Sequence, residues 1–530
     1  MKRTRNGVLA VAAAVAIAAA ACGSDSKSSD TTAASATTAG AATTAGAATT
    51  AAAATTAGAA TTAGAATTAG AATPGAGAST SAAGSAPSGG GEYGLIDGVY
   101  KGAGGFEIDP STECPADWNP NQGITDTDIQ LFISLPTSGP VAGFGLIADG
   151  MKSYFQLIND QGGIGGRKIN LTVKDDGYKP DQSKTNSDEA LGSNAYASFN
   201  TMLGTPNNLA IWDQLNDECM PDLFIGSGAP NWGDVKGHPW SIGLGLDYFT
   251  ESVLWSQWLK TEHPELKTVA ELTFNNDFGQ IYHRGFAYAT KDSDIKVLEQ
   301  ATHEAAAANL DNQFTTLAAT KADVLLIETT GAFCTQAMAA VEKEADWHPL
   351  VIMSATCASL NQFFKPLIDQ GLTGNGTYII ISAKDVLDPA NADVPFIKLY
   401  HDTLTAQGLD PKVSTYGTGW SYAWFAVEDM KLASTYAGGL DRGNLMLAAR
   451  NFDTVFPLAI DGLTAKTDGL KDAYFTEGGQ MMQYTVTDKA QIGTLVKKGD
   501  LVNLEGQLGT YETVEKASVP ATEGSSTTAG

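Results

Sequence analysis

The chain has 530 residues, with 58 acidic and 32 basic side chains, and its formal net charge at pH 7 is −26. A surface this acidic repels nucleic acid and anionic lipid, so neither is an expected partner. When the low-complexity ends described below are set aside, roughly 420 residues remain, which is too many for one hydrophobic core and predicts two lobes.

Residues 1–21 have the pattern of a secretory signal peptide. Lys2, Arg3 and Arg5 precede an apolar run over 7–21, which is shorter than the about 20 apolar residues of a membrane-spanning helix. Small residues lie directly before Cys22, and this arrangement resembles the bacterial lipobox. The resemblance implies that the Cys22 thiol takes a diacylglycerol and anchors the chain on the outer side of the cell membrane. The alternative is an ordinary signal peptide with an incidental cysteine.

Residues 22–95 form a low-complexity segment. Thr pairs recur with a period of six residues from Thr37 to Thr67, and Ala and Gly fill the spaces between them. The segment has few large side chains to bury, so we expect it to be disordered and to act as a stalk. A flexible linker of roughly 70 residues spans about 45 Å on average. O-glycosylation of the clustered Thr stays open, and the tail over 517–530 is also expected to be disordered.

Residues 96–516 alternate between strand-like and helical patterns. Ile129–Leu135 predicts a strand, the helical spacing of apolar residues from Phe144 to Asn159 predicts a helix, and the alternation that begins at Ile169 predicts the next strand. Further strands are predicted at Tyr196–Phe199, Leu223–Ile225, Val269–Phe274, Val324–Ile327, Leu350–Met353 and Tyr378–Ile381, with helices such as Gly279–Thr290 and Phe333–Glu344. This order predicts an α/β fold of two Rossmann-like lobes, with mainly parallel sheets covered by helices on both faces.

The loops after the predicted strands are the expected ligand-binding segments, because ligands bind beyond the carboxyl ends of parallel strands. Five of these loops are rich in small and hydroxylated residues, which expose backbone N–H groups and add adjustable hydrogen bonds. The candidate ligand-binding residues in them are Ser138, Met202, Gly204, Ser227, Gly228, Ala229, Thr329, Thr330 and Thr356. Helix capping is the alternative for any single loop, but five such loops together favour a shared small-molecule cleft.

Four cysteines remain after Cys22, an even number, and two disulfides are the simplest interpretation for an exported domain. Of the three possible pairings we favour Cys114–Cys219 and Cys334–Cys357, because Cys334 and Cys357 each follow a strand-like run and would lie at neighbouring strand ends. A metal site is the alternative, but no CxxC or HxxxH spacing supports it and the six His are scattered. No metal or other cofactor is expected.

One set of motifs is specific enough to indicate a family. The sequence SGP at 138–140 precedes a helix, residues 158–169 read INDQGGIGGRKI, and Asp175 and Asp176 follow the next strand. Together with Asn276–Gly279, these residues resemble the leucine/isoleucine/valine-binding protein family, the solute-binding components of branched-chain amino acid type ABC importers.

The resemblance implies the type I periplasmic-binding-protein architecture, in which three crossing segments join two lobes and the ligand lies between them. The crossings would lie near Gly243–Asp247, near Ile381–Lys384 and beyond Phe456. Lobe 1 would comprise about 126–245 and 382–455, and lobe 2 about 248–380 with part of the C-terminal region. The closed form would then dock on a membrane permease.

The family's site residues carry over onto several positions. Phe144 falls where the family places an aromatic wall, and Phe278 matches the aromatic residue of its Tyr-Gly element. Ser227 and Gly228 fall on the loop whose backbone holds the ligand carboxylate. The resemblance therefore adds Phe144 and Phe278 to the candidate ligand-binding residues.

Other positions depart from the family pattern. Ala229 stands where the family offers a Thr hydroxyl, and the loop 202–205 lacks the usual Ser run. The position that supplies a Glu for the ligand ammonium falls near Thr356, which carries no charge. A buried ammonium without a partner costs several kcal/mol, so a neutral molecule, an amide or an aromatic acid is at least as well favoured as an ordinary α-amino acid.

Further residues have two interpretations. Trp232 and Trp240 follow the Ser227 loop, and surface packing is favoured over stacking on a ligand. The aromatic stretch 420–425 indicates a buried helix rather than a cleft wall. Asp247 and Glu251 would suit a cationic group, but helix capping is the favoured role for both.

The favoured function is a monomeric solute-binding lipoprotein that captures a small polar molecule and delivers it to the permease of an ABC importer. A ligand-sensing lipoprotein of the same fold that reports to a membrane receptor is the alternative. An exported enzyme is not expected, because no metal cluster or carboxylate pair is visible and residues 419–423 lack the second Gly of the G-x-S-x-G nucleophile elbow.

Overall fold

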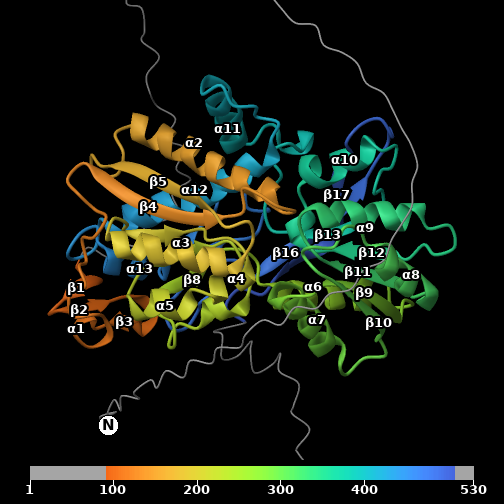
Figure 1. The fold of residues 1–530 in the computed structure, drawn as a ribbon, viewed down its shortest axis with the longest axis horizontal. Coiled ribbons are helices and arrows are strands. Elements are labelled where there is room, and N and C mark those ends of the chain that lie inside the picture. Colours follow the sequence, from red (N-terminus) through yellow and green to blue (C-terminus); the bar gives the residue numbers. More distant parts are fainter. Residues whose placement is uncertain (1–90, 508–530) are drawn as a thin grey trace, which may run out of the picture. The chain divides into compact units, whose positions relative to one another are not determined.

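The computed structural model describes residues 91–507, which form an α/β domain with two sheets (Figure 1). The predicted signal peptide, Cys22, most of the predicted stalk and the predicted tail lie outside the described residues. Within residues 91–507, no helix is both long and apolar enough to cross a membrane. The predicted α/β class with mainly parallel sheets is confirmed.

The sheet of lobe 1 has five parallel strands in the order β5-β4-β6-β7-β8. Its strands are β4 (Asp128–Leu135), β5 (Lys168–Asp175), β6 (Ser198–Asn200), β7 (Asp222–Ile225) and β8 (Ser241–Gly243). The helices between them are α2 (Leu146–Asp160), α3 (Pro180–Ser193), α4 (Thr205–Leu209) and α5 (Trp212–Asp217). The apolar residues of β4 are fully buried inside the sheet, which explains why this strand is an almost continuous apolar run.

Three later helices complete lobe 1. They are α11 (Pro395–Ala406), α12 (Ser414–Ala433) and α13 (Arg442–Ala449). Helix α12 packs closely on α2 because glycines lie at the contact. A Cβ atom at Gly419 would lie 2.2 Å from the carbonyl oxygen of Ile147, and one at Gly150 would lie 2.4 Å from that of Tyr416. The position of α12 therefore depends on the absence of side chains at these two residues.

The sheet of lobe 2 has seven strands in the order β10-β9-β11-β12-β13-β16-β17. Its strands are β9 (Thr268–Phe274), β10 (Lys296–His303), β11 (Val324–Glu328), β12 (Leu350–Met353), β13 (Tyr378–Ile381), β16 (Gly478–Thr485) and β17 (Thr494–Asn503). The five strands from β10 to β13 are parallel, and β16 and β17 are antiparallel additions at one edge. The helices of this lobe are α6 (Tyr248–Glu262), α7 (Asp277–Thr290), α8 (Asp311–Thr320), α9 (Ala332–Lys343) and α10 (Lys365–Ile368).

The chain passes between the two sheets three times. The first crossing runs from β8 to α6 and the second from β13 to α11. The third runs from β15 (Ala465–Lys466) to β16, and β15 pairs with β14 (Asp453–Thr454). Backbone hydrogen bonds hold two linking segments side by side. The N–H of Lys384 donates to the carbonyl oxygen of Leu458 at 2.7 Å, and that of Ile460 donates to Ser382 at 3.0 Å. These paired segments lie beside the cavity described below.

A small sheet of three strands precedes lobe 1. It consists of β1 (Gly94–Ile96), β2 (Val99–Lys101) and β3 (Glu107–Ile108). The predicted stalk boundary at residue 95 is therefore wrong, since β1 begins at Gly94. Asp97 and Gly98 both have positive φ, 54° and 84°, and form a tight turn that pairs β1 with β2.

Both predicted disulfides, Cys114–Cys219 and Cys334–Cys357, are present. The first joins the segment after α1 (Pro110–Glu113) to the turn before β7. Trp118 reinforces this link, since its indole N–H donates to the carbonyl oxygen of Cys219 at 3.0 Å. The second disulfide joins α9 to the turn after β12, and the expectation of neighbouring strand ends is confirmed because β11 and β12 pair directly.

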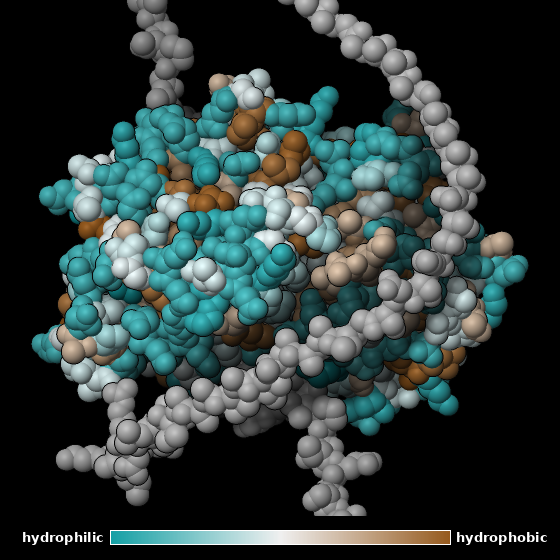
Figure 2. Space-filling view, viewed as in Figure 1, coloured by the Kyte–Doolittle hydropathy of each residue, from teal (hydrophilic) through white to brown (hydrophobic). Residues whose placement is uncertain are grey.

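The face of the domain in Figure 2 is mainly hydrophilic, with hydrophobic side chains in small, separate groups. Leu399 on α11 and Leu298 on β10 are among the exposed large hydrophobic residues. This distribution agrees with the acidic composition, and isolated apolar side chains of this kind are ordinary on protein surfaces.

Candidate ligand-binding site

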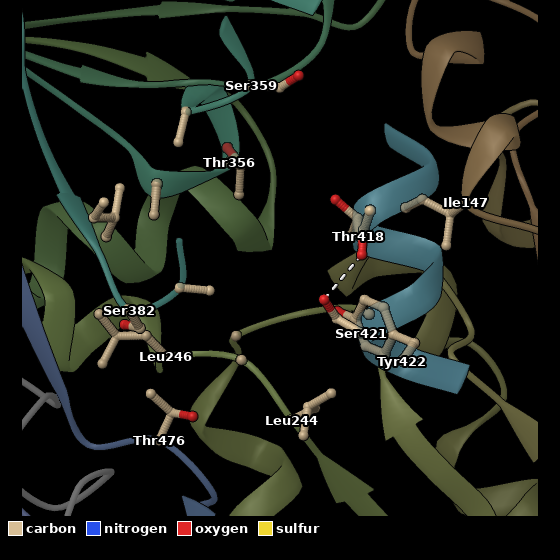
Figure 3. Close-up of a pocket in the computed structure, with 18 of the residues that line it drawn as sticks. Ile147, Leu244, Leu246, Thr356, Ser359, Ser382, Thr418, Ser421, Tyr422 and Thr476 are labelled. Atoms are coloured by element: carbon tan, nitrogen blue, oxygen red, sulfur yellow. Dashed lines mark hydrogen bonds between the residues drawn. The ribbon is translucent and has the colours of Figure 1, made fainter. Parts of the chain in front are cut away.

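A cavity of about 420 Å³ lies between the two lobes. It is bounded by the segments that follow β6, β7 and β8 in lobe 1 and by those that follow β11, β12 and β13 in lobe 2. These are the carboxyl ends of the parallel strands, where α/β folds bind their ligands. Figure 3 shows Thr418 and Ser421 on one side of this space and Thr356, Ser359 and Ser382 on the other.

Seven of the predicted ligand-binding residues line the cavity. They are Phe144, Gly204, Ser227, Gly228, Phe278, Thr330 and Thr356. They come from both lobes and from segments far apart in the sequence, and the shared edge of parallel strands brings them together. Their contact with a ligand stays a prediction.

The other four predicted residues do not line the cavity, because each is hydrogen-bonded or packed within its own lobe. The hydroxyl of Ser138 donates to the carboxylate of Asp175 at 2.7 Å. The hydroxyl oxygen of Thr329 lies 2.7 Å from a ring nitrogen of a buried histidine. Met202 and Ala229 are part of the hydrophobic core, with exposed fractions of 2% and 1%.

Most of the cavity wall is apolar or aromatic. Its larger apolar side chains include Phe144, Leu244, Leu246, Phe278, Phe425 and Phe456. Three tyrosines, Tyr178, Tyr248 and Tyr422, also line it. Burial raises the pKa of Tyr422 to about 12, so this hydroxyl stays neutral at physiological pH. Such a wall favours a ligand with an apolar body and a few polar groups.

Helix α12 supplies a strip of cavity residues that were not among the predicted ligand-binding residues. The strip comprises Ser414, Thr418, Ser421, Tyr422 and Phe425. Spacings of three and four residues place them on one face of the helix, and this spacing is the signal that would have found them. The prediction of a buried helix is right for Trp420, which is fully buried and donates to Ser153 at 3.2 Å, and for Phe425, which is 4% exposed. Phe425 and the partly buried Tyr422 also line the cavity, which that prediction did not favour.

The two tryptophans near the Ser227 loop belong to the core. Trp232 is 2% exposed and Trp240 is 1% exposed, and neither lines the cavity. The predicted surface packing is therefore wrong. Each indole packs against another aromatic ring, with ring centroids 5.6 Å apart for Trp118 and Trp240 and 5.6 Å apart for Trp212 and Trp232.

Two acidic residues at the start of α6 have different roles. Asp247 caps the helix, since its Oδ1 accepts from the N–H of Thr250 at 2.8 Å, and the capping prediction is confirmed. The same prediction is wrong for Glu251, which lines the cavity with an exposed fraction of 1%. Its Oε1 accepts from the N–H of Ala355, and its Oε2 is hydrogen-bonded to the Tyr282 hydroxyl, both at 2.7 Å. Burial raises the pKa of Glu251 to about 8, and the charge of Asp247 adds to the rise.

The segment after β13 brings Lys384 and Asp385 to the cavity. The Lys384 ammonium donates to Asp461 at 2.6 Å and to the carbonyl oxygen of Ala459 at 2.9 Å, so it already has a carboxylate partner. Burial raises the pKa of Asp385 to about 6, and this side chain accepts from the N–H of Leu387 at 2.8 Å. None of the described residues that line the cavity is His or Cys.

Hydrogen bonds join the two lobes at the rim of the cavity. The hydroxyl oxygens of Ser359 in lobe 2 and Ser414 in lobe 1 lie 2.6 Å apart. The hydroxyl of Thr415 donates to the side-chain carbonyl of Gln362 at 3.0 Å. All four residues line the cavity, so the lobes are in direct contact around it.

In the described part of the chain, one group of acidic side chains is close enough to hold a cation. Asp472, Glu477 and Glu505 have carboxylate oxygens within 4.8 Å of one another. None of the three lines the cavity, and the Lys466 ammonium lies 3.8 Å from Glu505. This group is therefore separate from the candidate ligand-binding site.

Comparison with known proteins agrees with this geometry. A model of periplasmic binding proteins matches residues 129–486. No curated protein matches the chain significantly. Among solved structures, a fatty acid ABC transporter substrate-binding protein from Thermomonospora curvata is 20% identical, with a TM-score of 0.61 over 77% of this chain and 99% of that protein.

Two further solved structures show the same likeness. A branched chain amino acid ABC transporter from Thermus thermophilus with bound valine is 14% identical, with a TM-score of 0.62 over 72% of this chain and 97% of that protein. A solute binding protein of an ABC transporter from Rhodopseudomonas palustris BisB5, in complex with 3,4-dihydroxy benzoic acid, is 15% identical, with a TM-score of 0.57 over 72% and 98%. The predicted type I periplasmic-binding-protein architecture is confirmed.

Proposed function

Because this chain belongs to the periplasmic binding protein family, we propose that it captures a small molecule in the cavity between its lobes and delivers it to the permease of an ABC-type importer. The family assignment confirms the resemblance that the sequence motifs indicated. It also implies an extracytoplasmic location, which agrees with the signal-peptide pattern of residues 1–21.

The observation that carries the proposal is the cavity itself. It lies at the carboxyl ends of both parallel sheets, and both lobes contribute its wall. A ligand in this position touches both lobes, so it binds the closed arrangement more tightly than an open one and shifts the population toward it. Ligand-dependent closure is what a permease needs to distinguish the loaded from the empty protein.

The cavity has a size typical of small-molecule sites. Its volume of about 420 Å³ lies within the range of about 300–1,000 Å³ found for ligand pockets. The neighbouring structures include one named for fatty acids, one with valine and one with 3,4-dihydroxy benzoic acid, so ligands differ within this fold. We propose that this chain takes an amino-acid-like molecule or a neutral, amide or aromatic-acid relative with an apolar body.

The proposed anchor is the lipid on Cys22, which lies outside the described residues. A tether to the membrane raises the effective concentration at which the binding domain meets its permease. In the native host the Cys22→Ser variant should leave the membrane fraction, and the mature N-terminal peptide of the unaltered chain should carry the mass of a diacylglycerol. An N-terminal peptide without lipid would contradict the anchor and leave the binding proposal standing.

A thermal-shift screen of the exported chain against small solutes tests the binding proposal. A ligand at a hundred times its Kd stabilises the folded state by about 2.7 kcal/mol. Candidate ligands should raise the melting temperature and then stimulate ATP hydrolysis by the cognate permease in vesicles. If no solute changes the melting temperature, the capture of small molecules is wrong; if ligands bind but only a membrane receptor responds, the importer role is wrong.

A further inference from the structure

Glu251 is an acidic group of the cavity whose neighbours supply no positive charge. Its side chain is 1% exposed, and both carboxyl oxygens have hydrogen-bond partners, the Ala355 N–H and the Tyr282 hydroxyl. Ala355 precedes Thr356, the residue near which related proteins place the Glu for a ligand ammonium. A carboxyl group is therefore present beside this loop after all, and it comes from α6.

The Tyr282 hydroxyl begins a series of hydrogen-bonded hydroxyls, of which Ser354 is buried and Thr356 is partly buried. It lies 2.8 Å from Ser354 Oγ, which lies 2.9 Å from Thr356 Oγ1. Thr356 Oγ1 in turn donates to the carbonyl oxygen of Thr329 at 3.2 Å. From Glu251 to Thr329 there are thus four successive oxygen–oxygen contacts, each of which needs one hydrogen atom.

The number of hydrogen atoms available to this series of contacts depends on the charge of Glu251. The three hydroxyls supply one hydrogen each. If Glu251 is ionised, Tyr282 donates to it and Ser354 donates to Tyr282. Thr356 then has one hydrogen for its two contacts, with Ser354 and with the carbonyl oxygen of Thr329, and one of them stays unfilled. If Glu251 carries a proton, it donates to Tyr282 and every contact along the series is filled. An unfilled contact between oxygens that are buried or partly buried has a free-energy cost, so this series of hydrogen bonds favours the neutral carboxyl.

The charged groups around Glu251 also favour its neutral form. Its own segment brings Asp247 and Tyr248, and α7 brings Tyr282. The turn after β12 contributes only uncharged residues, 354–357. The segment after β13 brings Lys384, which is paired with Asp461, and a second acid, Asp385. None of the described groups that face Glu251 offers it a counter-charge, and burial raises its pKa to about 8.

We propose that Glu251 binds the ligand as a neutral carboxyl, so that the cavity takes an uncharged molecule with an apolar body and a hydroxyl or amide hydrogen, and rejects the matching amine. The inference rests on the proposed function of the cavity. With its proton committed to Tyr282, Glu251 presents lone pairs that accept a hydrogen bond from the ligand. Phe278 and Tyr248, which also line the cavity, would then cover the apolar body of the ligand.

The first test needs no ligand. Carbon-13 NMR of the glutamate carboxyls in the whole exported chain, with the Glu251→Gln variant used to assign the signal, gives the protonation state of Glu251 directly. The Glu251 signal should keep its neutral position at pH 7 and titrate near pH 8. A signal that titrates below about pH 6, in the ordinary carboxyl range, would overturn the proposal.

The second test compares matched probes by calorimetry. Phenethyl alcohol and phenethylamine share one apolar body, as do hexanol and hexylamine, and each pair differs only in its polar end. At about pH 6 the alcohols should bind at least tenfold more tightly than the amines. Above the pKa of Glu251 the affinity for the alcohols should fall about tenfold per pH unit, because only the neutral form is competent. Tighter binding of the amines would overturn the proposal.

Two variants separate the role of Glu251 from a merely structural one. Glu251→Gln keeps a neutral group of the same shape, so it should bind the alcohols within about threefold of the unaltered protein and lose the pH dependence. Glu328→Gln is the control, because Glu328 on β11 is also a fully buried acid but does not line the cavity. It should keep the pH dependence.

The outcomes also distinguish this inference from the proposed function. If other solutes bind and the neutral probes do not, the class of ligand proposed here is wrong while capture of small molecules stands. If Glu251→Gln leaves affinity and pH dependence unchanged, the role of Glu251 is wrong. If no solute of any class binds, the proposed function fails and this inference fails with it.

Discussion

The two lobes face the cavity with different kinds of polar group. On lobe 1, the hydroxyls of α12 include Ser421, which donates to the carbonyl oxygen of Gly417 in its own helix at 2.9 Å. On lobe 2, Glu251, Tyr282 and Ser354 are hydrogen-bonded to one another. Lobe 1 also holds one hydroxyl pair at the cavity, Thr205 and Ser227, whose oxygens lie 2.7 Å apart. The network of lobe 2 differs because it contains a carboxyl group, so its hydrogen bonds depend on whether Glu251 is charged.

The largest effect is expected from the proton on Glu251. Its pKa is raised from 4.5 to about 8 in the folded protein, so the folded state holds this proton more tightly than the unfolded state does. The stabilisation is complete below pH 4.5 and is lost as the pH rises to about 8, at about 1.4 kcal/mol per pH unit. Glu251→Gln should remove this slope from the free energy of unfolding measured in urea. Equal slopes for the two proteins would break the contrast between the lobes.

A comparable but pH-independent effect is expected where α12 packs on α2. Gly419→Val places atoms against the carbonyl oxygen of Ile147 and should lower the free energy of unfolding by about 3 kcal/mol. Gly192→Ala is the matched control in α3, because no atom lies within 4 Å of the added Cβ. The control should be as stable as the unaltered protein or slightly more so. Equal stability of both variants would show that the lobe 1 wall does not depend on this contact.

A smaller effect separates Tyr282 of lobe 2 from Tyr422 of lobe 1. Tyr282→Phe removes one hydrogen-bond partner from Glu251 and one from Ser354, and should cost about 1–2 kcal/mol of stability. Tyr422→Phe on α12 removes a hydroxyl that has no hydrogen bond within the described residues, and should cost less than about 0.5 kcal/mol. Chemical unfolding of both variants gives the comparison directly. Similar costs for both would mean that the lobes do not differ as described.

The smallest effect is expected at Ser421. Its hydroxyl is satisfied by Gly417 of the same helix, so Ser421→Ala should change the free energy of unfolding by less than about 0.5 kcal/mol. Ligand affinity, measured by calorimetry with any solute found in the screen, should change by less than about threefold. A loss of tenfold or more would show that this hydroxyl contacts the ligand directly and would give lobe 1 a share in the polar chemistry.

Central strands and their helices were predictable because burial leaves a clear pattern. Leu350–Met353 and Tyr378–Ile381 match β12 and β13 residue for residue, since both are apolar runs inside a parallel sheet. β17 gave no such signal. It lies at the sheet edge, alternates irregularly with exposed residues, and contains Lys497 and Lys498, so its pattern resembles that of a loop.

The candidate site was predictable where the signal was local. Loops at strand ends pointed to Ser227, Gly228 and Thr330, because the edge of a parallel sheet brings such loops together. Thr329 shows the limit of this reasoning, since a hydroxyl at the same edge bonds to a neighbouring side chain instead. The role of Glu251 depends on partners 31 and 104 residues away, and no spacing in the sequence records such contacts.

The disulfide Cys114–Cys219 has a mechanical consequence. Tension applied from the N-terminal side of the domain reaches Cys114 after the small sheet of β1 to β3, and the covalent bond passes it directly to Cys219. The stretch between the two cysteines, which are 105 positions apart and enclose β4 and β5, is thereby relieved of load. The N-terminal side of the domain is therefore fastened covalently to lobe 1, and a pull on it reaches lobe 2 only through lobe 1 and its contacts with lobe 2.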